Sequence, residues 1–289
     1  MLARVSLVFA LVVCACTPDV APSRRVTPPT PLAPLTARAA DEVVVDMRGD
    51  GDVLVGRPLP VPENSDADRT LSLRWLTRGG ARAWRYAETP ALEARFVPGA
   101  GAVLVVTTEH TLVRLDAPGA EPSLLDRDVY GPLSLDAVGR RVVYTRGDPP
   151  TLEVVRADLA TGALTPLAPS LTPSWCPALS PDGREVLVVA SPDGTPAFYR
   201  LHDGAPPARW NLPADVALPT GPTAPVIFGD AVVYESDGAL HTLGLDGVVR
   251  GSQRGLSLPV YVPGSPTLLT HDAQRAVTFV APRELEGLR

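Results

Sequence analysis

Residues 177–204 alternate short polar turns with apolar runs of strand length. The first turn consists of Ser180, Pro181, Asp182 and Gly183. It precedes the apolar run 186–189, and a second Ser-Pro-Asp-Gly turn at 191–194 precedes the run 197–201. Proline fixes φ, aspartate caps the turn with its side chain, and glycine takes the positive φ that closes a hairpin. The pattern therefore predicts two adjacent antiparallel strands.

Weaker copies of this pattern recur along the chain. Their first apolar strands begin at Val53, Val103, Val142, Val186, Val232 and Val277. The intervals between these positions are 50, 39, 44, 46 and 45 residues. Repeats of about 40 to 50 residues are typical of four-stranded propeller blades. The spacing predicts a repeated all-β architecture.

The 28 residues from 177 to 204 resemble the repeat of TolB-type (WD40-like) β-propellers, in which turn, apolar strand, turn and aromatic strand end at Asp-Gly. The resemblance implies an all-β fold, a β-propeller whose blades have four antiparallel strands each. The six copies of the pattern predict six blades, with five or an irregular seven as the alternatives. The last copy is truncated, since nine residues follow Val280. We therefore expect an N-terminal strand at 42–46 to complete the last blade and hide its edge.

Composition and charge agree with a folded β-rich domain. The 33 prolines and 24 glycines among 289 residues disfavour long helices, while 45% hydrophobic residues suffice for a core. The net charge is −6. A nucleic-acid partner is disfavoured, because phosphate binding needs a basic surface.

The N-terminus has the pattern of an export signal. Arg4 precedes an apolar run at 5–13, which is too short for a hydrocarbon core that needs about 20 residues. The run leads into Cys14-Ala15-Cys16, which resembles the bacterial lipobox with alanine before the cysteine that becomes lipidated. The resemblance implies a lipoprotein signal peptide and a Cys16 anchored by palmitate or similar acyl chains. A plain secretory signal is the alternative.

Three parts of the chain follow from these patterns. Residues 1–15 are the predicted signal peptide, 16–40 a lipidated cysteine with a Pro/Thr/Ala-rich tether, and 41–289 the propeller domain. The tether contains six prolines from Thr17 to its end, which predicts an extended spacer. Thr17 follows the cysteine where aspartate would favour retention in the inner membrane. We expect the outer membrane facing the periplasm, with the cell surface as an alternative.

The sequence carries no recognisable catalytic or metal-binding constellation. The closest approach to a Gly-x-Ser-x-Gly nucleophile motif, at 255–259, ends in proline. The histidines, at His110, His202, His241 and His271, lack the short spacing of a zinc site. No histidine lies near Cys176 in the sequence to activate it, and we expect it to be buried. We expect no enzyme and no cofactor.

An acidic cluster at Asp46, Asp50 and Asp52 also invites a metal interpretation. Its spacing does not match an EF-hand loop, which needs a fixed glycine and a distal glutamate. We expect a polar turn there.

Aromatic residues in proline-stiffened segments that lead into the innermost strands form the candidate binding surface. These residues are Tyr130, Trp175 and Tyr261. Aromatic side chains on a rigid rim suit a protein partner, because they offer contact area at low entropic cost. Packing between blades is the alternative role.

Together these features predict a lipid-anchored propeller of the cell envelope that is a non-enzymatic protein-binding module. The alternative is an enzyme or a binder of a sugar or peptide that uses the axial channel. Three or more His, Asp or Glu side chains converging on that channel would favour the alternative. A propeller kept only as a spacer is a third possibility.

Overall fold

The computed structural model describes residues 38–61, 70–78, 83–85, 90–148, 150–213, 216–219, 224–281 and 284–285. The predicted signal peptide, Cys16 and nearly all of the predicted tether lie outside these residues. The described residues form 23 β-strands and one 3-10 helix, Pro169–Leu171. The fold is all-β, as predicted.

The strands follow one another as antiparallel meanders. The first sheet has eight strands and consists of two four-stranded blades joined by one bridge pair, Leu71 and Ala91. Its strands are β1 (Val43–Met47), β2 (Val53–Leu59), β3 (Thr70–Leu76), β4 (Ala83–Arg85), β5 (Ala91–Phe96), β6 (Val103–Thr107), β7 (Thr111–Leu115) and β8 (Ser123–Arg127).

Three four-stranded sheets and one three-stranded sheet complete the described strands. The third blade contains β9 (Ser134–Leu135), β10 (Arg141–Arg146), β11 (Glu153–Asp158) and β12 (Leu164–Leu167). The fourth contains β13 (Ser174–Leu179), β14 (Glu185–Ala190), β15 (Ala197–His202) and β16 (Ala208–Arg209). The fifth contains β17 (Val226–Phe228), β18 (Ala231–Ser236), β19 (Ala239–Gly244) and β20 (Val249–Arg254). The last contains β21 (Leu256–Tyr261), β22 (Leu268–Asp272) and β23 (Val277–Val280).

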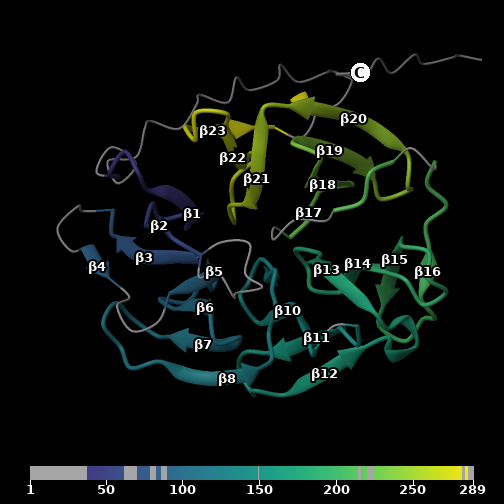
Figure 1. Ribbon diagram of the computed structural model, residues 1–289, viewed down its shortest axis with the longest axis horizontal. Helices are drawn as coiled ribbons and strands as arrows, with labels where there is room; N and C mark the ends of the chain where they lie inside the picture. The colour runs from purple at the N-terminus through teal and green to yellow at the C-terminus, as the bar shows by residue number, and fades with distance from the viewer. Residues whose placement is uncertain are drawn as a thin grey trace, which may run out of the picture. The chain divides into compact units, whose positions relative to one another are not determined.

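These sheets are arranged around a central axis in the order of the sequence (Figure 1). Strands β5, β13, β17 and β21 lie near the axis, whereas β8, β12, β16 and β20 lie at the periphery. The described strands thus form a β-propeller, and they fall into six successive groups. The predicted fold class is confirmed.

The predicted hairpin of the fourth blade is confirmed in detail. β14 and β15 pair antiparallel from Glu185 opposite His202 to Ala190 opposite Ala197. In the turn before β14, the Ser180 hydroxyl donates to Asp182 Oδ1 at 2.6 Å. The backbone of Gly183 has φ of +72°, a conformation that glycine adopts without strain. Turn chemistry alone was therefore sufficient to locate this hairpin.

The predicted closure of the ring by an N-terminal strand is wrong. β1 pairs antiparallel with β2, and in the described residues it makes no pairing with the last blade. The reason is the tight turn between the two strands, in which Arg48 N–H donates to the Asp52 carbonyl at 2.9 Å. Such a short connection favours pairing with the adjacent strand over closure across the whole domain.

The last blade also differs from the prediction by one strand. The repeat pattern places Val277 in the strand equivalent to those of Val53 and Val186, which is the second strand of each blade. In the structure Val277 begins β23, the third strand of the last blade, and the second strand is β22. The turn that precedes β22 holds Gly264 with φ of +80° and a bond from Ser265 N–H to the Val262 carbonyl at 2.9 Å. Because this turn has no Ser-Pro-Asp-Gly sequence, the repeat spacing points to the polar turn before Val277 instead. As a consequence, Tyr261 lies at the end of the inner strand β21, whereas the sequence pattern places it before the start of an inner strand.

The hydrophobic core lies between neighbouring blades. β14 is buried at five consecutive positions, 186–190, because both faces of its sheet are covered. One core cluster joins the fourth and fifth blades, where Phe198 and Tyr234 meet edge to face at 5.5 Å between ring centroids. Cys176 belongs to the same cluster, and burial raises the pKa of its thiol to about 12. The expected buried cysteine is confirmed.

Candidate functional site

A pocket with a volume of about 470 Å³ lies at one end of the propeller axis. All six innermost strands, or the turns that follow or precede them, contribute to its lining. The lining includes Asp46, Arg48 and Asp50 from β1 and its turn, Arg95 from β5, Leu133 and Ser134 around the start of β9, Leu179 from β13, Val226 from β17 and Tyr261 from β21. The pocket is therefore a product of the whole ring.

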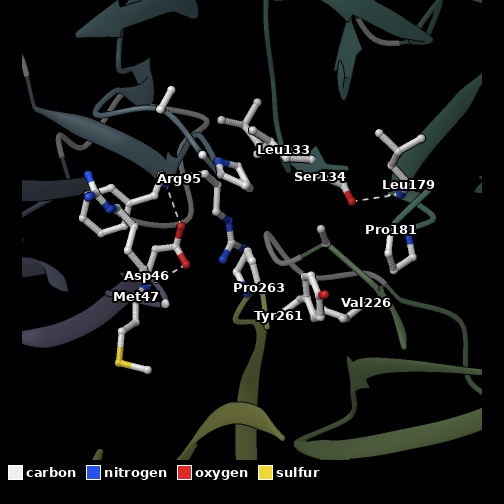
Figure 2. A pocket seen from close by; sticks show the side chains of 18 of the residues that line it. Asp46, Met47, Arg95, Leu133, Ser134, Leu179, Pro181, Val226, Tyr261 and Pro263 are labelled. Atoms are coloured by element: carbon white, nitrogen blue, oxygen red, sulfur yellow. Dashed lines mark hydrogen bonds between the residues drawn. The ribbon is translucent and has the colours of Figure 1, made fainter. Parts of the chain in front are cut away.

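All charged residues of the described pocket lining come from the first two blades, which also contribute apolar residues such as Met47 and Phe96. Asp46 and Arg95 come from the first two blades, whereas the third to sixth blades contribute residues such as Leu179, Val226 and Tyr261. Figure 2 shows Asp46 and Arg95 close to each other, with these other residues around the remaining wall. Such a lining, mostly apolar with few polar groups, is typical of ligand sites.

Irregular pairing shapes the charged side. The register shifts between Val44 and Asp46 in β1, and between Ala91 and Glu93 in β5. Bulges of this kind redirect a side chain relative to the regular alternation of a strand. Both acidic residues that follow a shift are buried.

Asp46 is 5% exposed and accepts two backbone hydrogen bonds. Its Oδ1 accepts from Met47 N–H at 2.8 Å, and its Oδ2 from Phe96 N–H at 2.7 Å. Burial raises the pKa of Asp46 to about 6, although the cation of Arg95 and the two N–H groups act in the opposite direction. The expectation that Asp46 lies in a polar turn is wrong, because it is a buried residue of β1; Asp50 and Asp52 do lie in and next to the turn.

Arg95 is 9% exposed and is held by Glu93. Its Nε donates to Glu93 Oε1 at 3.0 Å, and Glu93 Oε2 accepts from Leu133 N–H at 2.8 Å. Glu93 thus links the second and third blades while it orients the guanidinium group. An added Cβ at Gly131, whose φ is +61°, would lie 2.9 Å from Glu93 Oε2. The close approach explains a glycine at this position.

The pocket wall next to the first blade carries a second arginine. The guanidinium of Arg48 lies 5.6 Å from the ring centroid of Phe96 and forms an ion pair with Asp50. Arg48, Gly49 and Asp50 form the turn after β1, and the side chains of Arg48 and Asp50 pair with each other there.

The three residues of the predicted rim do not come together. Tyr261 lines the pocket and meets Phe228 edge to face at 5.8 Å. Tyr130 stacks on His110 at 4.3 Å, and Trp175 packs on the core cluster that contains Cys176. Neither Tyr130 nor Trp175 is among the described residues that line the pocket. All three side chains are half-buried, and their role in binding stays a prediction.

Sequence reasoning missed Glu93 and Arg95. They alternate within β5, so both project from the same face of an otherwise apolar strand. A charged pair with this spacing inside a strand next to the axis was the signal that could have located the site. The four repeat-turn residues 180–183 keep their structural role, and Pro181 contributes to the pocket wall.

The described residues show neither a metal-binding cluster nor a membrane-spanning helix. In the described part of the chain, no group of three or more His, Cys, Asp or Glu side chains could hold a metal ion. No helix among the described residues is long and apolar enough to span a bilayer. None of the four histidines is among the described lining residues of the pocket.

The fold and the axial pocket place this chain in the class of β-propellers. No protein-family model and no curated protein matches the sequence. Among solved structures, it is similar to TolB from Acinetobacter baumannii, with a TM-score of 0.52, 16% identity, and coverage of 78% of this chain and 62% of the TolB chain. The predicted resemblance to TolB-type propellers is confirmed as a similarity of fold.

Two other solved structures have similar chains. A chain of a nidogen/laminin complex has a TM-score of 0.50 and 15% identity, with coverage of 85% of this chain and 95% of that one. The tricorn protease has a TM-score of 0.54 and 10% identity, with coverage of 82% of this chain and 29% of the protease. The chain thus spans less than two thirds of TolB and under one third of the protease. Identities of this size describe the fold.

Proposed function

We propose that this chain is a lipid-anchored β-propeller of the cell envelope, which acts as a non-enzymatic binding module or scaffold for another protein. Cys16 carries the lipid, the tether at 16–40 separates the domain from the bilayer, and residues 41–289 bind the partner. The anchor is in the outer membrane and the domain faces the periplasm. No nucleic acid and no cofactor take part.

The axial pocket is the observation that carries the binding function. Its volume of about 470 Å³ lies within the range of roughly 300–1,000 Å³ that is typical of ligand sites, and all six inner strands contribute to it. A loop or side chain inserted along the axis would contact every blade at once. A rigid ring keeps the entropic cost of that contact low.

The similar structures support this proposal at the level of fold. One similar chain was solved in a complex between nidogen and laminin, so this fold occurs in a protein–protein complex. The TolB-type resemblance supports a place in the cell envelope, and the lipobox-like sequence before Cys16 supports a lipid anchor.

The alternative function is an enzyme or a binder of a sugar or peptide in the same pocket. The tricorn protease, which by its name is an enzyme, has a similar structure. Among the described lining residues, Asp46 and Asp50 are acidic, which is fewer than the three convergent groups expected of such a site. This count favours the binding module.

The lipid anchor is tested with Cys16→Ala in the full-length chain, with Cys14→Ala as the matched control. We expect the wild type and Cys14→Ala in the membrane fraction and Cys16→Ala in the soluble fraction, because an acylated cysteine binds the bilayer essentially irreversibly. A Cys16→Ala protein that stays membrane-bound would contradict the lipoprotein assignment.

Partner binding is tested by chemical crosslinking in native envelopes, followed by purification of the full-length protein. We expect one envelope protein to be recovered reproducibly, and to be absent from envelopes that lack the chain. Failure to recover a reproducible protein, together with saturable binding of a sugar or peptide, would favour the alternative function.

A further inference from the structure

The hydrogen-bonding capacity of the two charged pocket residues is used unequally. Both carboxyl oxygens of Asp46 already accept a backbone N–H group. Arg95 is bonded within the described residues through Nε alone, to Glu93. A guanidinium group has five N–H donors, so four donors on the two terminal nitrogens of Arg95 are left for a ligand in the pocket.

The position of Arg95 makes these donors a preformed site. Arg95 lines the pocket although 91% of its surface is covered. Its ion pair with Glu93 holds the guanidinium group in place. Glu93 is itself held by Leu133 N–H, so the supporting residues are in place before a ligand arrives. The planar fork of a guanidinium group matches a carboxylate in a bidentate arrangement.

We propose that the axial pocket binds a carboxylate of the partner polypeptide, which Arg95 holds through its two terminal nitrogens. The carboxylate belongs either to an aspartate or glutamate side chain or to the C-terminus of the partner. This inference rests on the proposed function, since it names the group that the pocket recognises. The apolar wall formed by Leu179, Val226 and Tyr261 accommodates the carbon chain that carries the carboxylate.

Arg95 is the anion-binding residue because the other charged groups around the pocket are either paired or acidic. On the turn after β1, Arg48 is paired with Asp50. On β5, Glu93 is paired with Arg95. The described lining residues from β9, β13, β17 and β21 include no Asp, Glu, Arg, Lys or His. Asp46 is thus the carboxyl group that a bound carboxylate would meet without an intervening ion pair.

Binding is therefore coupled to a proton on Asp46. Burial has already raised the pKa of Asp46 to about 6, and a second negative charge beside it raises this pKa further. The complex takes up a proton when it forms above that pH, so the affinity increases as the pH falls from 8 towards 5. Asp46→Asn has no proton to take up and should bind with little dependence on pH in this range.

Two matched pairs of peptides test the proposal on the full-length protein. The first pair is a capped alanine pentapeptide with aspartate or asparagine at its centre, and the second is an alanine pentapeptide with a free or amidated C-terminus. We expect the acidic member of one pair to bind about tenfold tighter than its neutral counterpart, and the pair that does so identifies the source of the carboxylate. Between pH 6 and pH 7.5 its affinity should fall by about tenfold.

Arg95→Lys is the decisive variant, because lysine keeps the charge next to Glu93 but lacks the bidentate fork. We expect about tenfold weaker binding of the acidic peptide. Arg209→Gln, which removes an exposed arginine on β16, is the control and should bind as the wild type. Urea unfolding of both variants shows whether each is folded. Equal binding of acidic and neutral peptides, no binding by either acidic peptide, or unchanged affinity of folded Arg95→Lys overturns the proposal.

The same variant separates this inference from the binding function. If crosslinking recovers a partner equally well with Arg95→Lys and with the wild type, the carboxylate site is wrong and the binding module stands. If the acidic peptide binds and no partner is recovered from envelopes, the site stands and the protein-binding function is wrong.

Discussion

In two pairs of neighbouring blades, a hydrogen bond near the axis joins the inner strands, but the accepting side chain differs between the pairs. Between the first and second blades, Asp46 of β1 accepts the N–H of Phe96, the last residue of β5, at 2.7 Å. Between the third and fourth blades, the Ser134 hydroxyl of β9 accepts the N–H of Leu179, the last residue of β13, at 2.9 Å. Both bonds join the inner strands of successive blades.

The difference between these two bonds concerns charge rather than geometry. A serine hydroxyl is neutral at every physiological pH, whereas a buried carboxyl group titrates and is sensitive to neighbouring charges. The aspartate therefore makes one side of the pocket responsive to protons and ligands, and Arg95 stands next to it. Ser134 thus joins two blades through a neutral group, whereas Asp46, at the equivalent position, also gives the candidate binding site a group that titrates.

The largest expected effect is on the charged side, from Glu93→Ala. This change leaves the buried Arg95 without its ion-pair partner and removes the acceptor of Leu133 N–H. Breaking a buried pair in this way costs about 3–5 kcal/mol. Urea unfolding measures it as a lower midpoint, and Glu93→Gln, which keeps an acceptor oxygen, should lose less. A loss below about 1 kcal/mol for Glu93→Ala would mean that the pair is not buried in solution.

A second effect should distinguish the two bonds by their response to pH. Since the pKa of Asp46 is about 6 in the folded protein and 3.8 ordinarily, the folded state holds the proton more tightly. The resulting stabilisation is fully present below about pH 4 and is lost as the pH rises through about 6; it amounts to about 3 kcal/mol.

The free energy of unfolding of the wild type, measured against that of Asp46→Asn from pH 4 to pH 8, isolates this contribution. The difference should fall with rising pH and level off near pH 7. A constant difference over the whole range would show that Asp46 does not titrate in this window.

The smallest effect is expected at the neutral bond, from Ser134→Ala. Loss of one hydrogen bond to a backbone N–H costs about 1 kcal/mol, and the cost should be the same at pH 4 and pH 8. Urea unfolding at the two pH values checks both statements. If the loss of stability caused by Ser134→Ala depended on pH, the proposed difference between Ser134 and Asp46 would be wrong.

Local turn chemistry made the fourth blade predictable from the sequence. Ser180, Asp182 and Gly183 each have one dominant conformational role, so their order located the hairpin. The same logic failed in the last blade, where a turn built on Pro263 and Gly264 lacks the repeat sequence. The resulting slip placed Tyr261 at the wrong end of its strand.

The axial pocket was much less predictable. Its residues range from Asp46 to Pro263 and meet only because the ring brings six inner strands together. Asp46 follows a register shift in β1, and no turn motif in the sequence predicts such an irregularity inside a strand. The charged residues Glu93 and Arg95 on one face of an apolar strand are visible in the sequence. They indicate a site near the axis only once β5 is known to be an inner strand.

Site-specific photo-crosslinking in native envelopes tests most directly whether the axial pocket is the binding surface. A photoreactive amino acid replaces Tyr261, which lines the pocket, or Val249, an exposed residue of the peripheral strand β20. We predict that the Tyr261 position captures the envelope partner, with a yield that drops in the Arg95→Lys background, and that the Val249 position captures none of it. Capture of the partner at Val249 with none at Tyr261 would contradict binding at the axial pocket.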